Sequence, residues 1–314
     1  MKHLPELIWT AIGLFALAFA CWLLARELRG LSLADVEAGL RAITVPRLAF
    51  AALSTLVAYG ALAWYDQIGL AHLGHRLGWG FVGLVSFTTY ALAHNVGASV
   101  LSGAVVRYRA YSTRGLGVQE VALLVAFCSF TFFLGSVTVG GFALILEPSL
   151  VERIAPLPVW SGQLVGLALL SILALFVIGS LRHFAPRKLW GFSLVYPRPP
   201  VAAKQILAGP LELLGATGII YFALPPEANP GFIAVAGIFV ASFSIALVSH
   251  APGGIGVLEF AFLKAMPEVP RADLIAALLV FRLFYLLAPF VFAIVVAALF
   301  ERHRIARLFR SAET

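Results

Sequence analysis

Charged side chains are scarce in this sequence. Asp, Glu, Lys and Arg together make up only 12% of the 314 residues, whereas they make up about a quarter of a soluble globular domain. Hydrophobic residues account for 61% of the chain, and the mean hydropathy is +0.97. Such a chain would expose a large apolar surface to water. The composition therefore excludes an ordinary soluble enzyme and predicts an integral membrane protein.

Cysteine and the familiar catalytic motifs are also lacking. The only two cysteines, Cys21 and Cys128, both lie inside apolar runs, which argues against a disulfide framework or a thiolate metal site. The histidines are too scattered to supply a set of metal ligands. The chain has neither a Walker sequence nor a Gly-x-Ser-x-Gly motif, so we expect no ATP hydrolysis. We therefore predict a protein that is not an enzyme and that uses no cofactor or metal.

Basic residues outnumber acidic ones, and the formal net charge is +7. The basic residues fall in short loops between apolar runs. Loops rich in Lys and Arg stay on the cytoplasmic side of a membrane, so the positive charge does not indicate nucleic-acid binding. The first apolar run, about residues 7–25, is interpreted as an uncleaved helix and not as a signal peptide, because Lys2 is offset by Glu6 and bulky Phe19 precedes Cys21. We expect a multi-pass protein of the bacterial cytoplasmic (inner) membrane.

The apolar residues form about eight stretches, most of them long enough to cross a hydrocarbon core of ~30 Å. These stretches cover roughly residues 7–25, 48–65, 81–104, 118–146, 161–180, 204–223, 231–265 and 274–300. The chain is therefore predicted to be an all-α polytopic membrane protein with a single transmembrane domain over residues 1–314.

Two of these stretches are not plain helices. Residues 81–104 contain several polar and small side chains, and residues 231–265 are interrupted by a run of proline and glycine. Proline removes a backbone donor and glycine disfavours helix, and the freed backbone is tolerated at membrane depth only inside protein or beside a wet cavity. We expect two broken or re-entrant helices, with breaks at Gly97, Gly103, Pro252, Gly253, Gly254 and Gly256.

A pattern around His94 recurs around His250. Ser86-Phe87 precedes His94 at the spacing at which Ser242-Phe243 precedes His250, an offset of 156 residues. The same offset brings the first, second and fourth apolar stretches onto later ones. The sequence therefore predicts two repeats, at about residues 7–146 and 161–302.

Loop charges indicate the orientation of the repeats. The 181–204 loop and the tail after residue 300 are basic and are expected in the cytoplasm, whereas the 147–160 and 225–230 loops are acidic or neutral. If both broken elements return to their own side, the halves have opposite topology, as in many secondary transporters. A parallel arrangement, in which residues 81–104 cross fully, is the alternative.

Three charged residues, Glu212, Glu259 and Arg282, lie well inside apolar stretches. A charge near the bilayer centre costs about 2.5–3.5 kcal/mol on insertion scales. Two compatible interpretations are a structural ion pair of Arg282 with Glu259 or Glu212, and a polar path for a substrate headgroup. His94 and His250, at equivalent positions, either hydrogen-bond freed carbonyls or titrate during transport.

Basic and aromatic residues follow the first broken element, at the expected cytoplasmic boundary. Guanidinium groups suit phosphate and tyrosines suit the membrane interface, so Arg107 and Arg109 are predicted to contact a phosphodiester. The alternative is that they only anchor the loop in the cytoplasm. The candidate substrate-binding residues are therefore Arg107, Arg109, Tyr111, Glu212, Glu259, Arg282, His94, His250 and Asn95.

Residues 93–112 (AHNVGASVLSGAVVRYRAYS), with 115–117 (GLG) and 252–259 (PGGIGVLE), resemble the transmembrane flippase domain of the lysylphosphatidylglycerol synthetase/flippase family. Glu212 and Arg282 also stand where that family tends to carry Glu and Arg. The resemblance covers nearly the whole chain and implies movement of an aminoacylated or otherwise modified phospholipid between leaflets. The chain ends at Thr314, soon after its last apolar stretch, so the soluble synthase activity of the fused members is not expected.

Three functions follow from these observations. The first is a lipid flippase or transporter, in which Arg107 and Arg109 meet the headgroup phosphate and Glu259 or Glu212 meets a cationic amine. The second is a proton-coupled secondary transporter of a small solute. The third is an accessory membrane subunit that presents lipid to a separate lipid-modifying enzyme. The expected partner is a membrane phospholipid, and a homo-oligomer is compatible with the sequence.

Single-cysteine labelling tests the predicted orientation. Cysteines placed at Arg187 and Arg310 should react only with reagent added from the cytoplasm, because both lie in basic segments. A cysteine at Glu227 should react only from outside. Labelling of positions 187 and 227 from the same side would contradict the topology.

Overall fold

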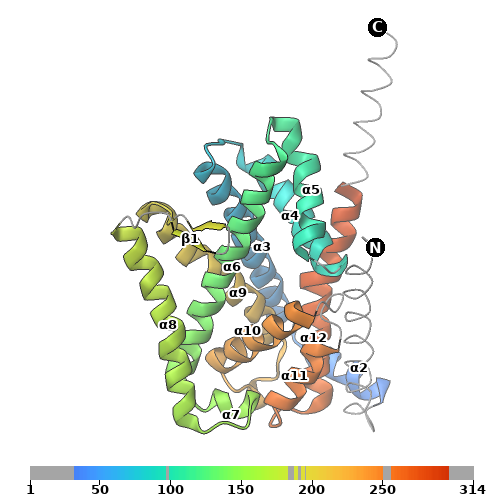
Figure 1. Cartoon of the computed structure of the whole chain (residues 1–314). Coiled ribbons are helices and arrows are strands. Elements are labelled where there is room, and N and C mark those ends of the chain that lie inside the picture. The colour runs from blue at the N-terminus through green and yellow to red at the C-terminus, as the bar shows by residue number, and fades with distance from the viewer. Residues whose placement is uncertain are drawn as a thin grey trace, which may run out of the picture.

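Long apolar helices form one bundle, with shorter helices between them (Figure 1). A computed structural model describes residues 32–96, 99–182, 187–189, 192–194, 196–249 and 256–296. Five helices in this part of the chain are long and apolar enough to cross a membrane. The expected first stretch, about residues 7–25, lies outside the described residues. The prediction of an all-α polytopic membrane protein is confirmed.

The five long helices are joined at alternating ends of the bundle. They are α3 (Val45–His72), α6 (Val118–Leu146), α8 (Val159–Leu181), α9 (Pro199–Ala223) and a last helix over Arg271–Val296. This last helix begins as α12 (Arg271–Phe281) and passes through a π-helical turn, η4 (Arg282–Leu287).

Short elements occupy the two ends. One end, here the η1 end, carries η1 (Ser112–Arg114) and an antiparallel hairpin of β1 (Arg187–Leu189) and β2 (Phe192–Leu194), with Lys188 opposite Ser193. The other, the α7 end, carries α7 (Leu150–Ile154), η2 (Pro226–Ala228) and α2 (Leu33–Ala42). Ser32 and Asp35 form a capping box that starts α2, and the hydrogen bonds from Ser32 lower the pKa of Asp35.

Both stretches that were expected to break do break. The first forms α4 (Trp79–Val96) and α5 (Ser99–Tyr111), and the second forms α10 (Phe232–Ser249) and α11 (Val257–Ala265). Helices α5 and α11 have 13 and 9 residues, or about 20 and 14 Å, too short to cross ~30 Å of hydrocarbon. Each packs back on the helix that precedes it, so each pair is a hairpin.

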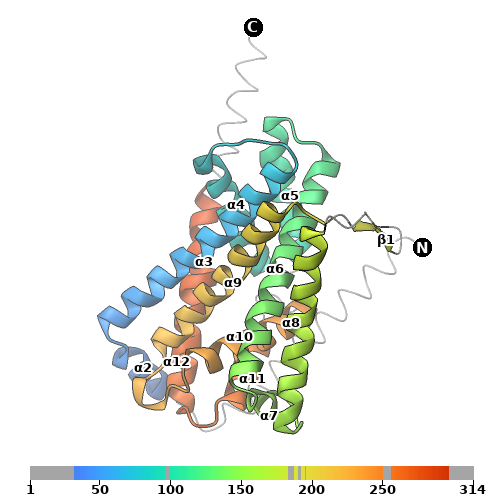
Figure 2. The same ribbon diagram turned by 90° about the vertical axis from the view of Figure 1, so that its left-hand side faces the viewer.

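The two hairpins enter the bundle from opposite ends. Figures 1 and 2 show α4 and α5 at the η1 end, and α10 and α11 beside α7 at the other. Helices α3 and α9, which the offset of 156 residues relates, run side by side in opposite directions. Opposite placement is what an inverted repeat requires. Superposition of the two repeats about an axis in the membrane plane stays a prediction.

Breaks do not occur at every glycine that was expected to cause one. Gly103 lies inside α5, where an added Cβ would stand 3.3 Å from Thr89 Cγ2 of α4. Its small size therefore serves close packing within the hairpin, and the expectation of a break at Gly103 is wrong. Gly256 does end the second break, with φ of +81° at the amino end of α11. The other expected breaks, at Gly97, Pro252, Gly253 and Gly254, lie outside the described residues.

Small residues let the long helices approach closely. An added Cβ at Gly135 of α6 would lie 2.5 Å from the backbone carbon of Gly209 in α9. At Gly215, also in α9, it would lie 2.7 Å from the backbone nitrogen of Ala58 in α3. Helices in lipid associate through such contacts, because lipid tails are as apolar as the side chains. These close contacts hold α9 between α6 and α3 and so fix the positions of the side chains inside the bundle.

Gly135→Ala should destabilise the protein. The new methyl group would collide with backbone that cannot rotate away, and overpacking of this kind costs about 1–3 kcal/mol. Gly140→Ala in the same helix is the matched control, because its Cβ would meet only Val240 and Leu169 side chains at 3.6 and 3.7 Å. Melting temperatures in detergent compare the two, and equal values would contradict this account of the crossing.

Candidate functional site

A buried ion pair ties the first hairpin to a crossing helix. Asp66 of α3 is fully buried, and Arg107 of α5 is 4% exposed. Arg107 Nη2 donates to Asp66 Oδ1 at 2.7 Å, and Nε lies 3.2 Å from both carboxylate oxygens. Tyr111 donates its hydroxyl to Oδ2 at 2.8 Å, and Cys128 Sγ lies 3.3 Å from Oδ1. Donors from two helices, α5 and α6, thus satisfy the carboxylate on α3, as a buried charge requires.

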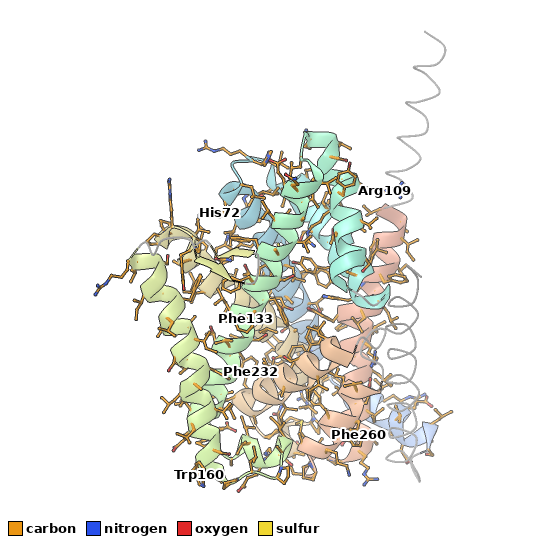
Figure 3. The ribbon with its side chains drawn as sticks, viewed as in Figure 1. His72, Arg109, Phe133, Trp160, Phe232 and Phe260 are labelled. Carbon is orange, nitrogen blue, oxygen red and sulfur yellow. The ribbon has the colours of Figure 1, made fainter. Side chains whose placement is uncertain are left out.

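The position of Arg107 differs from the expectation. Its guanidinium stacks on Tyr90 of α4, 4.8 Å from the ring centroid, and faces the interior of the bundle and not the membrane boundary. The boundary position is taken by Arg109, which is exposed at the η1 end (Figure 3). Tyr111 is buried as well, so it does not lie at the interface either. Arg107 and Arg109 therefore differ in exposure, because residues two positions apart point to different sides of a helix.

A second ion pair ties the second hairpin to the last helix. Arg282 Nε donates to Glu259 Oε1 at 2.5 Å. The other oxygen of Glu259 accepts from the Gly256 backbone N–H at 2.8 Å and closes the amino end of α11. Both side chains are largely buried. Of the two structural pairings considered for Arg282, the structure therefore has the one with Glu259.

The two ion pairs have opposite polarity. In the first half the arginine belongs to the hairpin and the acid to the crossing helix, whereas in the second half the acid belongs to the hairpin. In both halves the short returning helix of the hairpin carries the charge. The positions are not related by the repeat offset, so this likeness is one of architecture and not of sequence.

Glu212 lies in the middle of α9 and makes a different contact. It is 1% exposed, and its Oε1 accepts a hydrogen bond from the Tyr285 hydroxyl at 2.6 Å. Tyr285 belongs to η4, and its ring stacks on His94 with centroids 5.3 Å apart. Glu212 and the tip of the first hairpin are thus joined through one aromatic ring.

The π-helical turn supplies acceptors to the first half of the chain. Tyr59 of α3 donates to the Tyr285 carbonyl at 2.9 Å, and Asn95 of α4 donates to the Leu286 carbonyl at 3.1 Å. A π-helical turn leaves carbonyls free of their usual partners and occurs often at functional sites. Of the polar tip residues, His94 and Asn95 therefore contact the same π-helical turn as Glu212, whereas His250 lies outside the described residues.

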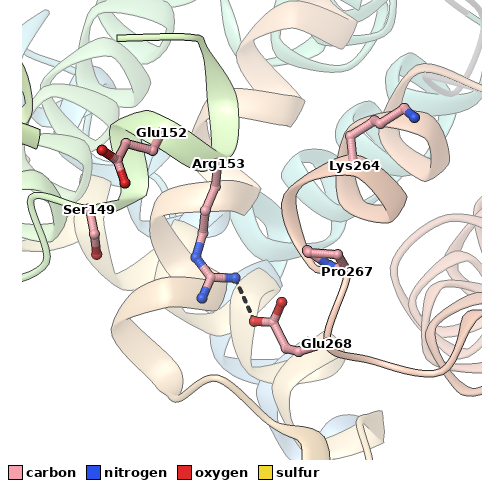
Figure 4. A pocket seen from close by; sticks show the side chains of 6 residues that line it. All are labelled: Ser149, Glu152, Arg153, Lys264, Pro267 and Glu268. Carbon is pink, nitrogen blue, oxygen red and sulfur yellow. Dashed lines mark hydrogen bonds and ion pairs between the residues drawn. The ribbon is translucent and has the colours of Figure 1, made fainter. Parts of the chain in front are cut away.

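A second polar feature lies at the α7 end. Figure 4 shows a pocket lined by Ser149, Glu152, Arg153, Lys264, Pro267 and Glu268. Arg153 of α7 donates to the Ala265 carbonyl at 3.0 Å and to Glu268 at 2.5 Å. These bonds hold α7 against the loop after α11. Within the described ranges, no three His, Cys, Asp or Glu side chains gather as a metal ion would require.

Comparison with known proteins places the chain among bacterial membrane proteins. It is 29% identical to the uncharacterized protein slr0712 of Synechocystis sp. over 291 residues, 92% of this chain and 90% of that protein. It is 30% identical to the inner membrane protein YbhN of Escherichia coli over 259 residues, 78% of this chain and 77% of that one. A shorter match, 26% over 159 residues, relates 43% of the chain to 19% of a phosphatidylglycerol lysyltransferase of Staphylococcus haemolyticus. No family model matches.

Asp66→Asn should destabilise the protein strongly. The change leaves the buried Arg107 guanidinium without its counter-charge, and breaking a buried pair in this way costs about 3–5 kcal/mol. Adding Arg107→Gln to the same chain should restore much of the melting temperature, because no uncompensated charge remains.

Glu37→Gln is the control for this pair. It breaks the exposed pair of Glu37 with Arg41 in α2, which should contribute only about 0.3–0.5 kcal/mol. If Asp66→Asn and Glu37→Gln lower the melting temperature equally, the Asp66 pair does not hold the hairpin.

Proposed function

This chain belongs to the family of the inner membrane protein YbhN and is a multi-pass protein of the bacterial inner membrane. We propose that it is a lipid flippase. The substrate would be a phospholipid, with an aminoacylated headgroup as one candidate. Its headgroup would pass through the interior of the bundle while its acyl chains stay in the membrane.

The observation that carries the proposal is the pair of hairpins that enter from opposite ends. Neither α5 nor α11 reaches the far side, so the two breaks lie within the bundle. Backbone that leaves the helix at this depth must face protein or a wet cavity. Broken helices that meet near the bilayer midplane form the substrate sites of many secondary transporters.

The charges of the hairpins suit the two parts of a headgroup. A phosphate would be attracted first to Arg109 at the exposed η1 end and would then compete with Asp66 for Arg107, because guanidinium binds both carboxylate and phosphate in a bidentate manner. An amine would compete with Arg282 for Glu259. Each step would release a hairpin from its crossing helix, so that substrate entry and helix movement are linked.

The lysyltransferase match supports a lipid as substrate. The name of that protein, phosphatidylglycerol lysyltransferase, refers to a phospholipid and to lysine. A phospholipid that carries lysine has both an anionic phosphate and a cationic amine. For this chain we propose movement of the lipid without covalent chemistry, with the lipid supplied by a separate lipid-modifying enzyme.

Transfer of fluorescent phospholipid between leaflets of reconstituted vesicles tests the proposal. Wild-type protein should make inner-leaflet label accessible to an external quencher, and Glu259→Gln should slow this about ten- to a hundredfold, since a hydrogen bond to a charged group is worth ~1.5–3 kcal/mol. If Glu259 serves only as the partner of Arg282, the double change Glu259→Gln with Arg282→Gln should restore both stability and transfer.

Control variants and alternative outcomes show what would contradict the flippase proposal. Glu227→Gln, in an exposed loop outside both hairpins, should transfer label like the wild type. Full transfer by Glu259→Gln would remove that residue from the site. Vesicles in which the wild-type protein moves no lipid, but does move a small solute, would favour the secondary transporter.

A further inference from the structure

Glu212 differs from the other two acids inside the bundle. Asp66 and Glu259 each face a guanidinium, whereas in the part of the chain that the structure describes no cationic side chain forms an ion pair with Glu212. Its Oε1 accepts from Tyr285, and its Oε2 has no hydrogen-bond partner among the described residues. A carboxylate in this setting would leave a full negative charge in an apolar interior, which is costly unless the group is neutralised.

The titratable groups that face Glu212 are mostly phenols. Tyr59 and Tyr65 face it from α3, and Tyr285 faces it from η4. His94 lies behind Tyr285 on α4, and the Arg282 guanidinium of the same π-helical turn is bonded to Glu259. The thiol of Cys128, on α6, is bonded to Asp66. Helices α8 and α10 carry no titratable side chain, so no charge from them compensates Glu212.

Polar groups lead along α9 from the η1 end to Glu212. Gln205 lies seven residues earlier, on the same face of the helix, is buried, and donates to Thr131 Oγ1 at 2.9 Å. Between the two, Tyr65 donates to the Gly209 carbonyl at 3.3 Å. Pro210 lacks a backbone N–H, so the carbonyl four residues before it has no helical partner. These hydrogen-bonding groups lie along α9 between the η1 end and the carboxyl.

We propose that Glu212 is a proton-binding site and that exchange of its proton is coupled to movement of the first hairpin. The inference rests on the proposed lipid transport and names its energy source. When Glu212 is ionised, Tyr285 donates to it and holds the ring against His94 at the hairpin tip. When a proton from one side of the membrane neutralises the carboxyl, that hydrogen bond weakens and the tip is released. The proton leaves to the other side when the bond re-forms.

Infrared spectroscopy tests the proton site without any transport. Difference spectra recorded while the pH of the purified protein is raised should contain the band of a protonated carboxyl that loses its proton. This band should be absent from Glu212→Gln and present in Glu227→Gln, whose altered acid is exposed. A wild-type spectrum identical to that of Glu212→Gln at every pH would overturn the inference.

Vesicles with an imposed pH gradient test the coupling. The steady-state distribution of fluorescent phospholipid should change by up to about tenfold per pH unit if one proton moves with each lipid. Glu212→Gln should lose this response, and Glu212→Asp, which keeps a carboxyl, should retain part of it. The coupling would be overturned if the pH gradient does not change the lipid distribution in wild-type vesicles. It would also be overturned if the gradient changes the distribution equally in Glu212→Gln vesicles.

The two measurements separate the inference from the flippase proposal. If the wild-type protein moves no lipid, the proposed function fails, and the infrared band alone decides whether Glu212 binds a proton. If Glu212→Gln does not fold, Tyr285→Phe replaces it, because it leaves the carboxyl but removes the donor to its charged form. The pH midpoint of the band should then move upward, and an unmoved midpoint would contradict the role of Tyr285.

Discussion

A charge inside an apolar bundle must be matched by another charge or by a proton, and this constraint organises the interior of the protein. The cost of an unmatched charge in lipid exceeds that of most packing errors, so each buried acid marks a place where two helices are obliged to meet. Asp66 joins α3 to the first hairpin, Glu259 joins the second hairpin to the last helix, and Glu212 joins α9 to the π-helical turn. The returning helices α5 and α11 are too short to cross the membrane. Apolar packing of α4 and α10 in the core and these polar contacts together hold the two hairpins in the bundle.

Much of this arrangement was predictable because its causes are local. Clustered polar, glycine and proline residues inside a long apolar stretch favour a break, and both hairpins were expected on that ground, whereas single residues such as Gly103 and Pro210 remain inside helices. An ion pair of Arg282 with Glu259 or Glu212 was one of the two interpretations that the sequence supported, because an isolated arginine at that depth is costly. The loops that join the long helices follow from the lengths of the apolar stretches. The breaks and the loops follow from residues that are near one another in the chain.

Asp66 was missed, and the reason is instructive. The apolar stretch of about residues 48–65 ends just before this acid, which therefore resembles the start of a polar loop in the sequence, but α3 continues to His72. Its partner Arg107 resembles part of a basic loop for the complementary reason, because Arg109 and Arg114 follow it in the sequence. The packing of α5 against α4 and α6, together with the bonds to Asp66 of α3, turns Arg107 inward. A rule that extends each apolar helix by two turns and searches there for opposite charges would have found both residues.

The reversed polarity of the two ion pairs has a consequence for how sequences of this family can diverge. At each pair, a change of one residue alone leaves a buried charge, whereas a matched change of both residues preserves neutrality. Substitutions at 66 and 107 should therefore be inherited together, and so should those at 259 and 282, while no covariation is expected between the pairs. Because the hairpin contributes the cation in one half and the anion in the other, an exchange of hairpins between halves would place like charges opposite each other. The two halves are thus no longer interchangeable parts, however similar their backbones are.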